Sequence, residues 1–184
     1  MSIVKNLVSR MGGQMTIESV EGAGSSFHIE LPFEAAPAAE AGAALPVGQT
    51  VLVAESRESQ AEKIAEYLRA GGLEPICLKE GLRVVTWLTE AQYEEHMPCA
   101  LLLGTELTDT TVLDLAHHAR QLTGPEFPII LVSEEDWAPI EYRATRAGIN
   151  AFVPCPLFAS KLLQTLAEQI NNNQTGDVLH PRMS

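Results

Sequence analysis

The chain has 184 residues, and its 24 acidic and 12 basic residues give a formal net charge of −12. This length holds one domain of ordinary size with appendages. The negative charge argues against nucleic acid as a direct partner and against direct contact with anionic membranes, because both are bound through clustered Lys and Arg. No apolar stretch is long enough for a transmembrane helix, and the amphipathic Met1–Arg10 does not resemble a signal peptide.

Cysteine usage indicates the compartment. The three cysteines, Cys77, Cys99 and Cys155, have no CxxC spacing and form no disulfide framework. Free cysteines of this kind fit a reducing environment, so we expect a cytoplasmic location.

Composition divides the chain into four stretches. Residues 1–33 alternate helical and strand patterns, and residues 34–48 are rich in Ala, Pro and Gly and are typical of a linker. Residues 49–170 carry nearly all the sizeable apolar clusters, which predicts the main domain. Residues 171–184 open with three asparagines and are predicted to be a disordered tail.

The first predicted elements are a short helix and a hairpin within residues 1–33. Ile3, Leu7 and Met11 share one face of a helix. Two alternating runs, typical of half-buried strands, follow: Met15 and Ile17, then Phe27, Ile29 and Leu31. A piece of about 30 residues with one helix and one hairpin cannot bury a core by itself.

Residues 49–170 repeat a strand–helix pattern five times. The strands are short, aliphatic and non-alternating, as in a parallel sheet covered on both faces: Val51–Ala54, Ile76–Leu78, Cys99–Leu103, Phe127–Val132 and Ala151–Val153. The helices are marked by Ala61, Ile64, Ala65 and Leu68; by Val84, Val85 and Leu88; by Val112, Leu115, Ala116 and Ala119; by Pro139 as first residue and Gly148 as the end; and by Leu162, Leu163, Leu166 and Ile170. This alternation predicts a doubly wound α/β fold with right-handed parallel crossovers.

Four segments of this region resemble strands of the receiver domain of two-component signalling, together with their carboxyl ends. Val51–Ser56, Ala100–Gly104, Pro128–Ser133 and Gly148–Pro156 resemble its first, third, fourth and fifth strands. The resemblance covers about two thirds of the chain. It implies the flavodoxin-like (CheY-like) strand order 2-1-3-4-5, with a site at the carboxyl edge of the sheet.

The resemblance also implies that the phosphoryl site of the family is degenerate here. Where the family has two acids that hold magnesium, this chain has Glu55 and Ser56, and the place of the phosphoryl-accepting aspartate is held by Gly104. Cys155 stands where a lysine is expected, and only the hydroxyl residue, Ser133, matches. Gly104 has no nucleophile, Ser56 is a poorer ligand for magnesium than a carboxylate, and Cys155 is no cation. We therefore expect no phosphorylation and no bound Mg²⁺.

Other residues could carry chemistry, and we expect ordinary roles for them. Glu106, Asp109 and Asp114 follow the third strand and are interpreted as solvated acids rather than substitute acceptors. Cys155 is interpreted as inert rather than as a redox thiol, and the adjacent His117 and His118 as a solvated helix face rather than a metal site. Further expectations are a cis bond before Pro156 and a packing role for Phe152. Trp87 and Trp137 could mark partner surfaces, although Trp87 is adjacent to the core face of its helix and could instead be buried.

The N-terminal stretch resembles the end of a histidine-kinase ATP-binding domain. The residues that carry the resemblance are Ile3–Val8, Met11–Gly13 and the turn segment with Gly22, Gly24 and Ser25. The family's phosphorylated histidine, its magnesium-holding asparagine helix and its aspartate-bearing nucleotide loop all lie upstream of this segment. The resemblance implies a remnant with a vestigial glycine turn, so no ATP binding and no enzyme activity are expected of this chain.

Three hypotheses for function remain open. The chain can be the pseudo-receiver end of a hybrid sensor histidine kinase, a regulatory or docking module without phosphoryl chemistry. Its partners would then be the kinase core, a true receiver or a histidine-phosphotransfer protein, and the parent kinase could be attached to the inner membrane. The second hypothesis is a fragment of an active, ATP-dependent autophosphorylating kinase, and the third is a free-standing interaction protein from a truncated gene.

Overall fold

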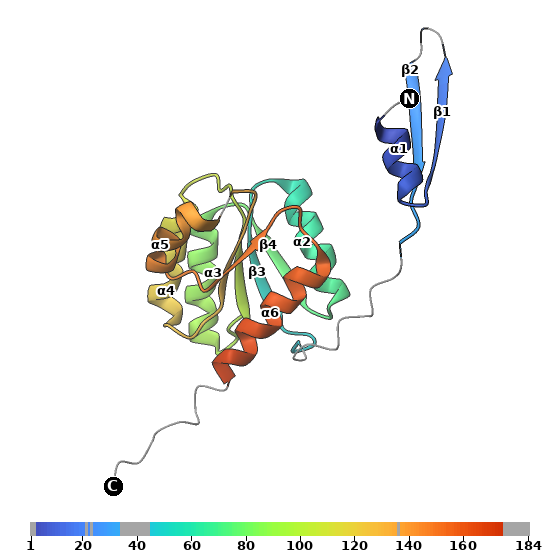
Figure 1. Cartoon of the computed structure of the whole chain (residues 1–184). Coiled ribbons are helices and arrows are strands. Elements are labelled where there is room, and N and C mark those ends of the chain that lie inside the picture. The colour runs from blue at the N-terminus through green and yellow to red at the C-terminus, as the bar shows by residue number, and fades with distance from the viewer. Residues whose placement is uncertain (1–2, 21, 23, 34–44, 136, 175–184) are drawn as a thin grey trace. The chain divides into compact units, whose positions relative to one another are not determined.

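The computed structural model describes residues 3–20, 22, 24–33, 45–135 and 137–174 (Figure 1). The chain divides into two compact units, Met1–Glu40 and Ala41–Ser184, here called the N-terminal unit and the sheet unit. Most of the predicted linker, residues 34–44, lies outside the described residues, as does the part of the predicted tail from residue 175 onward.

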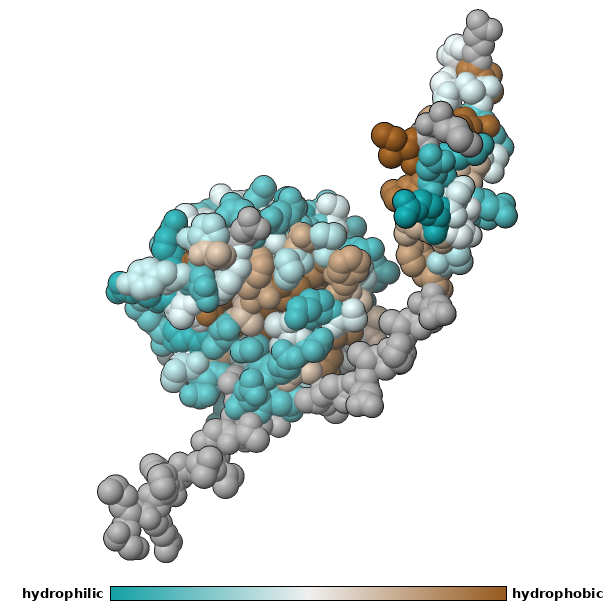
Figure 2. All heavy atoms as spheres, in the orientation of Figure 1, coloured by the Kyte–Doolittle hydropathy of each residue, from teal (hydrophilic) through white to brown (hydrophobic). Residues whose placement is uncertain are grey.

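The N-terminal unit is a helix followed by a hairpin, as predicted. Helix α1 spans Ile3–Arg10, and strands β1 (Gln14–Val20) and β2 (Gly24–Glu30) pair antiparallel with Ile17 opposite Phe27. The expectation of half-buried strands is wrong for Ile17, Phe27 and Ile29, which are exposed. One helix and one hairpin offer no second layer to cover them, and Figure 2 shows apolar residues on the surface of this unit.

The sheet unit contains a five-stranded parallel sheet. Its strands are β3 (Thr50–Ala54), β4 (Glu74–Leu78), β5 (Ala100–Leu103), β6 (Ile129–Ser133) and β7 (Ala151–Pro154). Their spatial order is β4-β3-β5-β6-β7, which is the predicted flavodoxin-like order 2-1-3-4-5. The parallel register aligns Ala54 with Leu103 and Ser133 with Pro154, so neighbouring strands end together at one edge.

Helices cover both faces of this sheet (Figure 1). They are α2 (Glu58–Ala70), α3 (Gly81–Glu94), α4 (Val112–Thr123), α5 (Trp137–Ala147) and α6 (Ala159–Gln174). Strand residues such as Leu101 and Leu103 point into a core shared with α3, α4 and α5, whereas Leu102 points into a second core with α2 and α6. Because each central strand is buried on both faces, its sequence is apolar without alternation.

Strand ends differ from the prediction by one or two residues, as at β6, and two helix boundaries also differ. Pro139 is the third residue of α5 rather than the first, since the helix begins at Trp137. Residues 171–174, predicted to belong to a disordered tail, continue helix α6. Asn171 supports this extension because its side-chain amide donates to the carbonyl oxygen of Ala167 at 2.7 Å, one turn earlier.

Candidate functional site

The carboxyl ends of four parallel strands gather the five residues singled out as the degenerate phosphoryl site. Glu55 and Ser56 follow β3, Gly104 follows β5, Ser133 is the last residue of β6, and Cys155 follows β7. Strand pairing brings these positions to one edge of the sheet. Such an edge is where open α/β sheets bind their ligands.

Glu55 is the buried charge of this edge. Its side chain has 0% exposure, and its carboxylate accepts hydrogen bonds from the backbone nitrogens of Arg57 at 2.9 Å and Thr105 at 3.2 Å. The Arg57 guanidinium lies 3.5 Å from Oε2 of the same carboxylate. A buried carboxylate needs such donors, because an unpaired charge in the interior is strongly destabilising.

Gly104 leaves the space that this carboxylate fills. The Gly104 backbone nitrogen donates to the carbonyl oxygen of Ala54 at 2.8 Å, which fixes its place beside β3. A Cβ atom at position 104 would lie 2.1 Å from Oε2 of Glu55 and 2.6 Å from Cδ. Contacts this short are repulsive. Any side chain at position 104 therefore requires Glu55 to move.

Both serines of the edge form hydrogen bonds with backbone groups. The Ser56 backbone nitrogen donates to the carbonyl oxygen of Glu106 at 2.9 Å, tying the loop after β3 to the loop after β5. Ser133 is buried, and its hydroxyl accepts from the backbone nitrogen of Glu135 at 3.0 Å. The Ser133 hydroxyl thus closes the turn that leads into α5.

Cys155 is half-buried at the end of β7 and carries the predicted cis bond to Pro156. Burial, followed by the charge of Glu134, raises the pKa of its thiol, and this outweighs the opposing effect of Arg57. A raised pKa keeps the thiol protonated at neutral pH, and the thiolate is the reactive form. The positive charge of Arg57 thus acts on this thiol without activating it.

Sequence reasoning missed Arg57, which reaches across the whole edge. Its Nη2 donates to Oγ1 of Thr105 and to Oε1 of Gln60, both at 2.6 Å, and its Nη1 donates to Oε1 of Glu134 at 3.0 Å. Burial opposes the charged form, but the hydrogen bonds to Glu134 and Glu55 prevail and raise the pKa of Arg57. An arginine two residues beyond a strand-end acid was the signal in the sequence.

The side chains at this edge do not form a suitable set of ligands for a magnesium ion. Mg²⁺ takes oxygen ligands in near-octahedral geometry and is usually held by one or two carboxylates. Glu55 is already bound by backbone and guanidinium donors, and Gly104 supplies no ligand. The positively charged Arg57 lies against the same carboxylate. Among the residues that the structure describes, no group of three His, Cys, Asp or Glu side chains could hold a metal ion.

The neighbouring acids are bound or exposed away from Gly104. Asp109 accepts from the first two backbone nitrogens of α3, those of Gly81 at 2.7 Å and Leu82 at 2.9 Å. Asp114 pairs with the hydroxyl of Thr111 at 2.6 Å in the first turn of α4. Glu106 is exposed. Asp109 and Asp114 thus bind at the starts of helices α3 and α4.

The two histidines of α4 have separate neighbours. A ring nitrogen of His117 lies 3.0 Å from the side-chain nitrogen of Gln121, and one of His118 lies 2.9 Å from the carbonyl oxygen of Asp114. In each contact the two residues are four positions apart, about one helical turn, and both contacts lie on the exposed surface of the helix.

The glycine turn of the N-terminal unit joins β1 to β2. Gly22 and Gly24 have φ angles of 81° and 102°, which favour glycine, and a Cβ at either position would meet nothing within 4 Å. The hydroxyls of Ser19 and Ser25 are 2.8 Å apart across the hairpin. The turn therefore needs glycine for its backbone conformation and not for the close approach of another group.

Comparisons with known proteins find a sensory/regulatory protein and histidine kinases that are similar to this chain. It is 25% identical over 201 residues to the sensory/regulatory protein RpfC of Xanthomonas campestris, an alignment that covers 91% of this chain and 27% of that protein. It is 30% identical over 174 residues to the circadian input-output histidine kinase CikA of Synechococcus elongatus, covering 90% of this chain and 22% of that protein. The chain thus spans about a quarter of the length of these curated relatives.

Solved structures give the fold. A CheY-like receiver domain from Methanospirillum hungatei matches with a TM-score of 0.60 and 16% identity, over 69% of this chain and 97% of that domain. The receiver domain of the sensor histidine kinase PA1611 of Pseudomonas aeruginosa, solved with magnesium in its active-site cleft, matches with a TM-score of 0.59 and 21% identity, over 68% of this chain and 99% of that domain. No protein-family model matches the chain.

The sheet unit therefore has the CheY-like receiver fold. Among the described residues, no helix has both the length and the apolar character needed to cross a membrane.

Proposed function

We propose that this chain carries a pseudo-receiver, a receiver-fold module that accepts no phosphoryl group and acts through protein contacts within a hybrid sensor histidine kinase. The observation that carries the proposal is Gly104 at the end of β5. It supplies no nucleophile, and the space beside it belongs to the buried carboxylate of Glu55, 2.1 Å from where a Cβ would lie. Restoring an acid at position 104 therefore requires the Glu55 side chain to move.

The residues around Gly104 support the same conclusion. Phosphoryl transfer to a carboxylate needs an acceptor and a cation that balances the developing charge. Glu55, the one acid that the resemblance assigns to the site, already binds Arg57, and Cys155 takes the place of a lysine. The nearby Asp109 is bound to the start of α3. We propose that the chain uses neither Mg²⁺ nor ATP as a cofactor.

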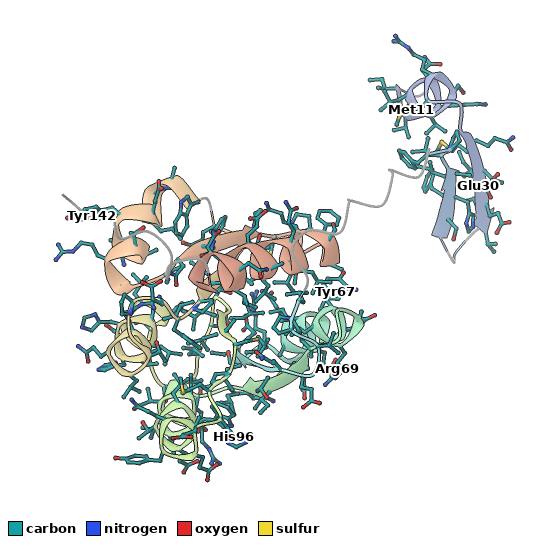
Figure 3. All side chains as sticks on the ribbon, turned by 90° about the horizontal axis from the view of Figure 1, so that it is seen from below. Met11, Glu30, Tyr67, Arg69, His96 and Tyr142 are labelled. Carbon is teal, nitrogen blue, oxygen red and sulfur yellow. The ribbon has the colours of Figure 1, made fainter. Side chains whose placement is uncertain are left out.

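The kind of parent protein suggests the partners. The relatives are sensor kinases several times longer than this chain, so we propose the kinase core, a true receiver or a histidine-phosphotransfer protein as partners, in the cytoplasm. Two surfaces are candidates for these contacts: helix α2 and the face that runs from β6 to α6. On the second surface Tyr142 of α5 is exposed and points outward (Figure 3).

Nuclear magnetic resonance tests the missing chemistry. We expect the amide shifts of the full chain to stay unchanged when Mg²⁺ and beryllofluoride are added, because no carboxylate is available to bind the fluoride complex. A receiver with an aspartate at the position of Gly104 serves as the positive control. Saturable shifts around Ser56 and Gly104 would contradict the proposal.

A second candidate function is that of a fragment of an active histidine kinase. It is favoured by alignments to kinases that cover about 90% of the chain, whereas receiver domains cover only 68–69%. The additional matched region includes the N-terminal unit, whose exposed Ile17 and Phe27 suit a surface that packs on the rest of an ATP-binding domain. Gly22, Gly24 and Ser25 would then be the vestigial end of that domain.

The coding sequence upstream of Met1 distinguishes both kinase-related candidates from a free-standing interaction protein. In-frame kinase motifs would assign ATP-dependent autophosphorylation to the parent and the docking role to this chain. An in-frame stop codon would instead favour a free-standing interaction protein. Incubating the chain with labelled ATP then tests its own activity, and we expect no labelled protein.

A further inference from the structure

Arg57 is bound to the loops after three different strands. Its guanidinium lies 3.5 Å from Glu55 in the loop after β3, donates to Thr105 in the loop after β5 at 2.6 Å, and donates to Glu134 in the loop after β6 at 3.0 Å. A guanidinium has five N–H donors in a fixed plane, so one side chain can hold several acceptors in one geometry.

Backbone contacts strengthen the link between the first two loops. The Glu55 carboxylate accepts from the backbone nitrogen of Thr105 at 3.2 Å, and the Ser56 nitrogen donates to the Glu106 carbonyl at 2.9 Å. This arrangement is possible because Gly104 has no side chain, as a Cβ there would displace Glu55. The Arg57 guanidinium and the Glu55 carboxylate thus contact each other, and both also bind Thr105 in the loop after β5.

The third loop connects this network to helix α5. Glu134 lies between Ser133, the last residue of β6, and Trp137, the first residue of α5. The Trp137 ring stacks on Phe152 of β7, with ring centroids 5.1 Å apart and an interplanar angle of 25°. Both aromatic rings also pack against the core cluster beneath α3, α4 and α5. A bond to Glu134 therefore restrains the entry of α5, and through Trp137 it restrains Phe152.

We propose that Arg57 is a built-in clamp, an internal cation that holds the loops after β3, β5 and β6 in one arrangement and so keeps the α5–β7 face in a single conformation without any bound ligand. The Arg57 clamp is defined here as Arg57 with Glu55, Thr105 and Glu134. This inference rests on the proposed function, since a module that accepts no phosphoryl group needs another way to fix its loops. It makes the α5–β7 face, with the exposed Tyr142, a constant surface for a protein partner.

Hydrogen exchange of the full chain measures the clamp. We expect Arg57→Ala to accelerate amide exchange in residues 104–108 and 133–135 by about fivefold or more, because local opening no longer breaks these bonds. Glu134→Gln keeps an acceptor oxygen but removes the charge, which weakens this arm of the clamp, so a smaller acceleration is expected, in residues 133–135 alone. The matched control is Arg83→Ala, which removes an exposed arginine of α3 that pairs with Glu80 at 3.8 Å, and no change in either loop is expected.

Fluorescence of Trp137 gives a second measurement. In a Trp87→Phe background Trp137 is the sole tryptophan of the chain, which has two. Release of the clamp is expected to shift its emission to longer wavelength in Arg57→Ala and less in Glu134→Gln. Should Arg57→Ala not fold, Arg57→Lys tests the same point, since a lysine keeps the charge but cannot reach three acceptors in one plane.

The outcomes separate the clamp from the proposed function. The clamp would be overturned if folded Arg57→Ala had the same amide exchange in both loops and the same Trp137 emission as the wild type. In that case a wild type whose amide shifts do not respond to Mg²⁺ and beryllofluoride would still support the pseudo-receiver. A wild-type response to Mg²⁺ and beryllofluoride would instead overturn the proposed function, whatever the Arg57 variants do. The clamp is supported if amide exchange in the two loops is fastest in Arg57→Ala, less accelerated in Glu134→Gln and unchanged in Arg83→Ala.

Discussion

The two units of this chain use similar apolar residues in opposite ways. In the sheet unit, Ile130 on β6 has 0% exposure, because helices cover both faces of the sheet. In the N-terminal unit, Ile29 on β2 is 46% exposed, because among the described residues of this unit the short α1 is the only helix that can cover the hairpin. The sheet unit contains its own core, whereas the N-terminal unit presents apolar surface that suits a further layer of protein.

The glycines show the same contrast. Gly22 in the hairpin turn has open space where a Cβ would be, whereas at Gly104 that space holds the Glu55 carboxylate. The first glycine serves the conformation of the backbone and the second serves a close contact. Internal pairing in the sheet unit thus extends from its core to its polar edge, where the buried Glu55 carboxylate is bound by two backbone nitrogens and contacts the Arg57 guanidinium.

A matched pair of isoleucine substitutions tests this contrast with the largest expected effect. Ile130→Ala should lower the free energy of unfolding by about 2–5 kcal/mol, because it leaves a cavity in a closed core. Ile29→Ala should change it by less than about 0.5 kcal/mol, as for a surface site. Denaturant unfolding followed by tryptophan fluorescence makes the measurement, since Trp87 and Trp137 both lie in the sheet unit. Equal losses in the two variants would mean that the units share one core.

A matched pair of glycine substitutions tests the same contrast between the two units, and we expect an effect of intermediate size. Gly104→Ala should destabilise the sheet unit by about 1–3 kcal/mol, because the new methyl group overpacks the site of Glu55. Gly22→Ala should leave the same unfolding transition unchanged, since its strain of about 1–2 kcal/mol falls on the hairpin turn. Urea titration of both variants gives the two values.

The cause of the Gly104 effect has its own control. In a Glu55→Ala background the space beside position 104 is empty, so adding Gly104→Ala should be less destabilising than it is in the wild type. The difference between the two backgrounds is the coupling between the residues, which for groups in contact is typically about 0.5–3 kcal/mol. Strictly additive losses would show that the overlap with Glu55 is not what makes glycine necessary here.

The fold could be predicted because its signal is local. Short apolar runs such as Leu101–Leu103 mark strands buried on both faces, and the helices between them have plain 3.6-residue periodicity. The resemblance to receivers then fixed the strand order, and the position of Gly104 at the end of β5 followed from the register.

The interactions at the sheet edge could not be predicted, because they join residues far apart in sequence. Thr105 and Glu55 are 50 positions apart, and Glu134 and Arg57 are 77 apart. No local sequence pattern predicts that the Arg57 guanidinium reaches both Thr105 and Glu134. Nor does one predict that the Glu55 carboxylate lies where a Cβ of residue 104 would be. The glycine was recognised as a missing acceptor, but its contact with Glu55 depends on the packing of two loops.

Helix ends were also beyond local reasoning. The run of asparagines after Ile170 has low helix propensity and predicted a tail, yet α6 continues through Gln174. Tertiary packing of the α6 stripe against α2 and the sheet, with Ile170 still in the core cluster, carries the helix past the weak residues.

The smallest expected effect concerns the loop after β5 and depends on pH. Asp109 accepts from the Leu82 and Gly81 nitrogens, and these bonds lower the pKa of its carboxyl group. A lowered folded-state pKa means that the unfolded chain binds the proton more readily, so the stabilisation is fully present above the unfolded pKa, about 3.9. It is lost as the pH falls below that value and through the lower pKa of the folded state.

Asp109→Asn isolates this contribution because asparagine keeps an acceptor oxygen but does not titrate in this range. We expect the variant to be slightly less stable than the wild type at neutral pH, since a carboxylate is the better partner for the start of α3. The difference should shrink as the pH falls below about 4. Thermal unfolding at a series of pH values provides the comparison, with Glu90→Gln on the exposed side of α3 as the control. A difference that stays constant down to the lowest pH would mean that the charge of Asp109 does not hold this loop to α3, and that the loop depends on its other bonds, such as those between Thr105 and Arg57 and between Ser56 and Glu106.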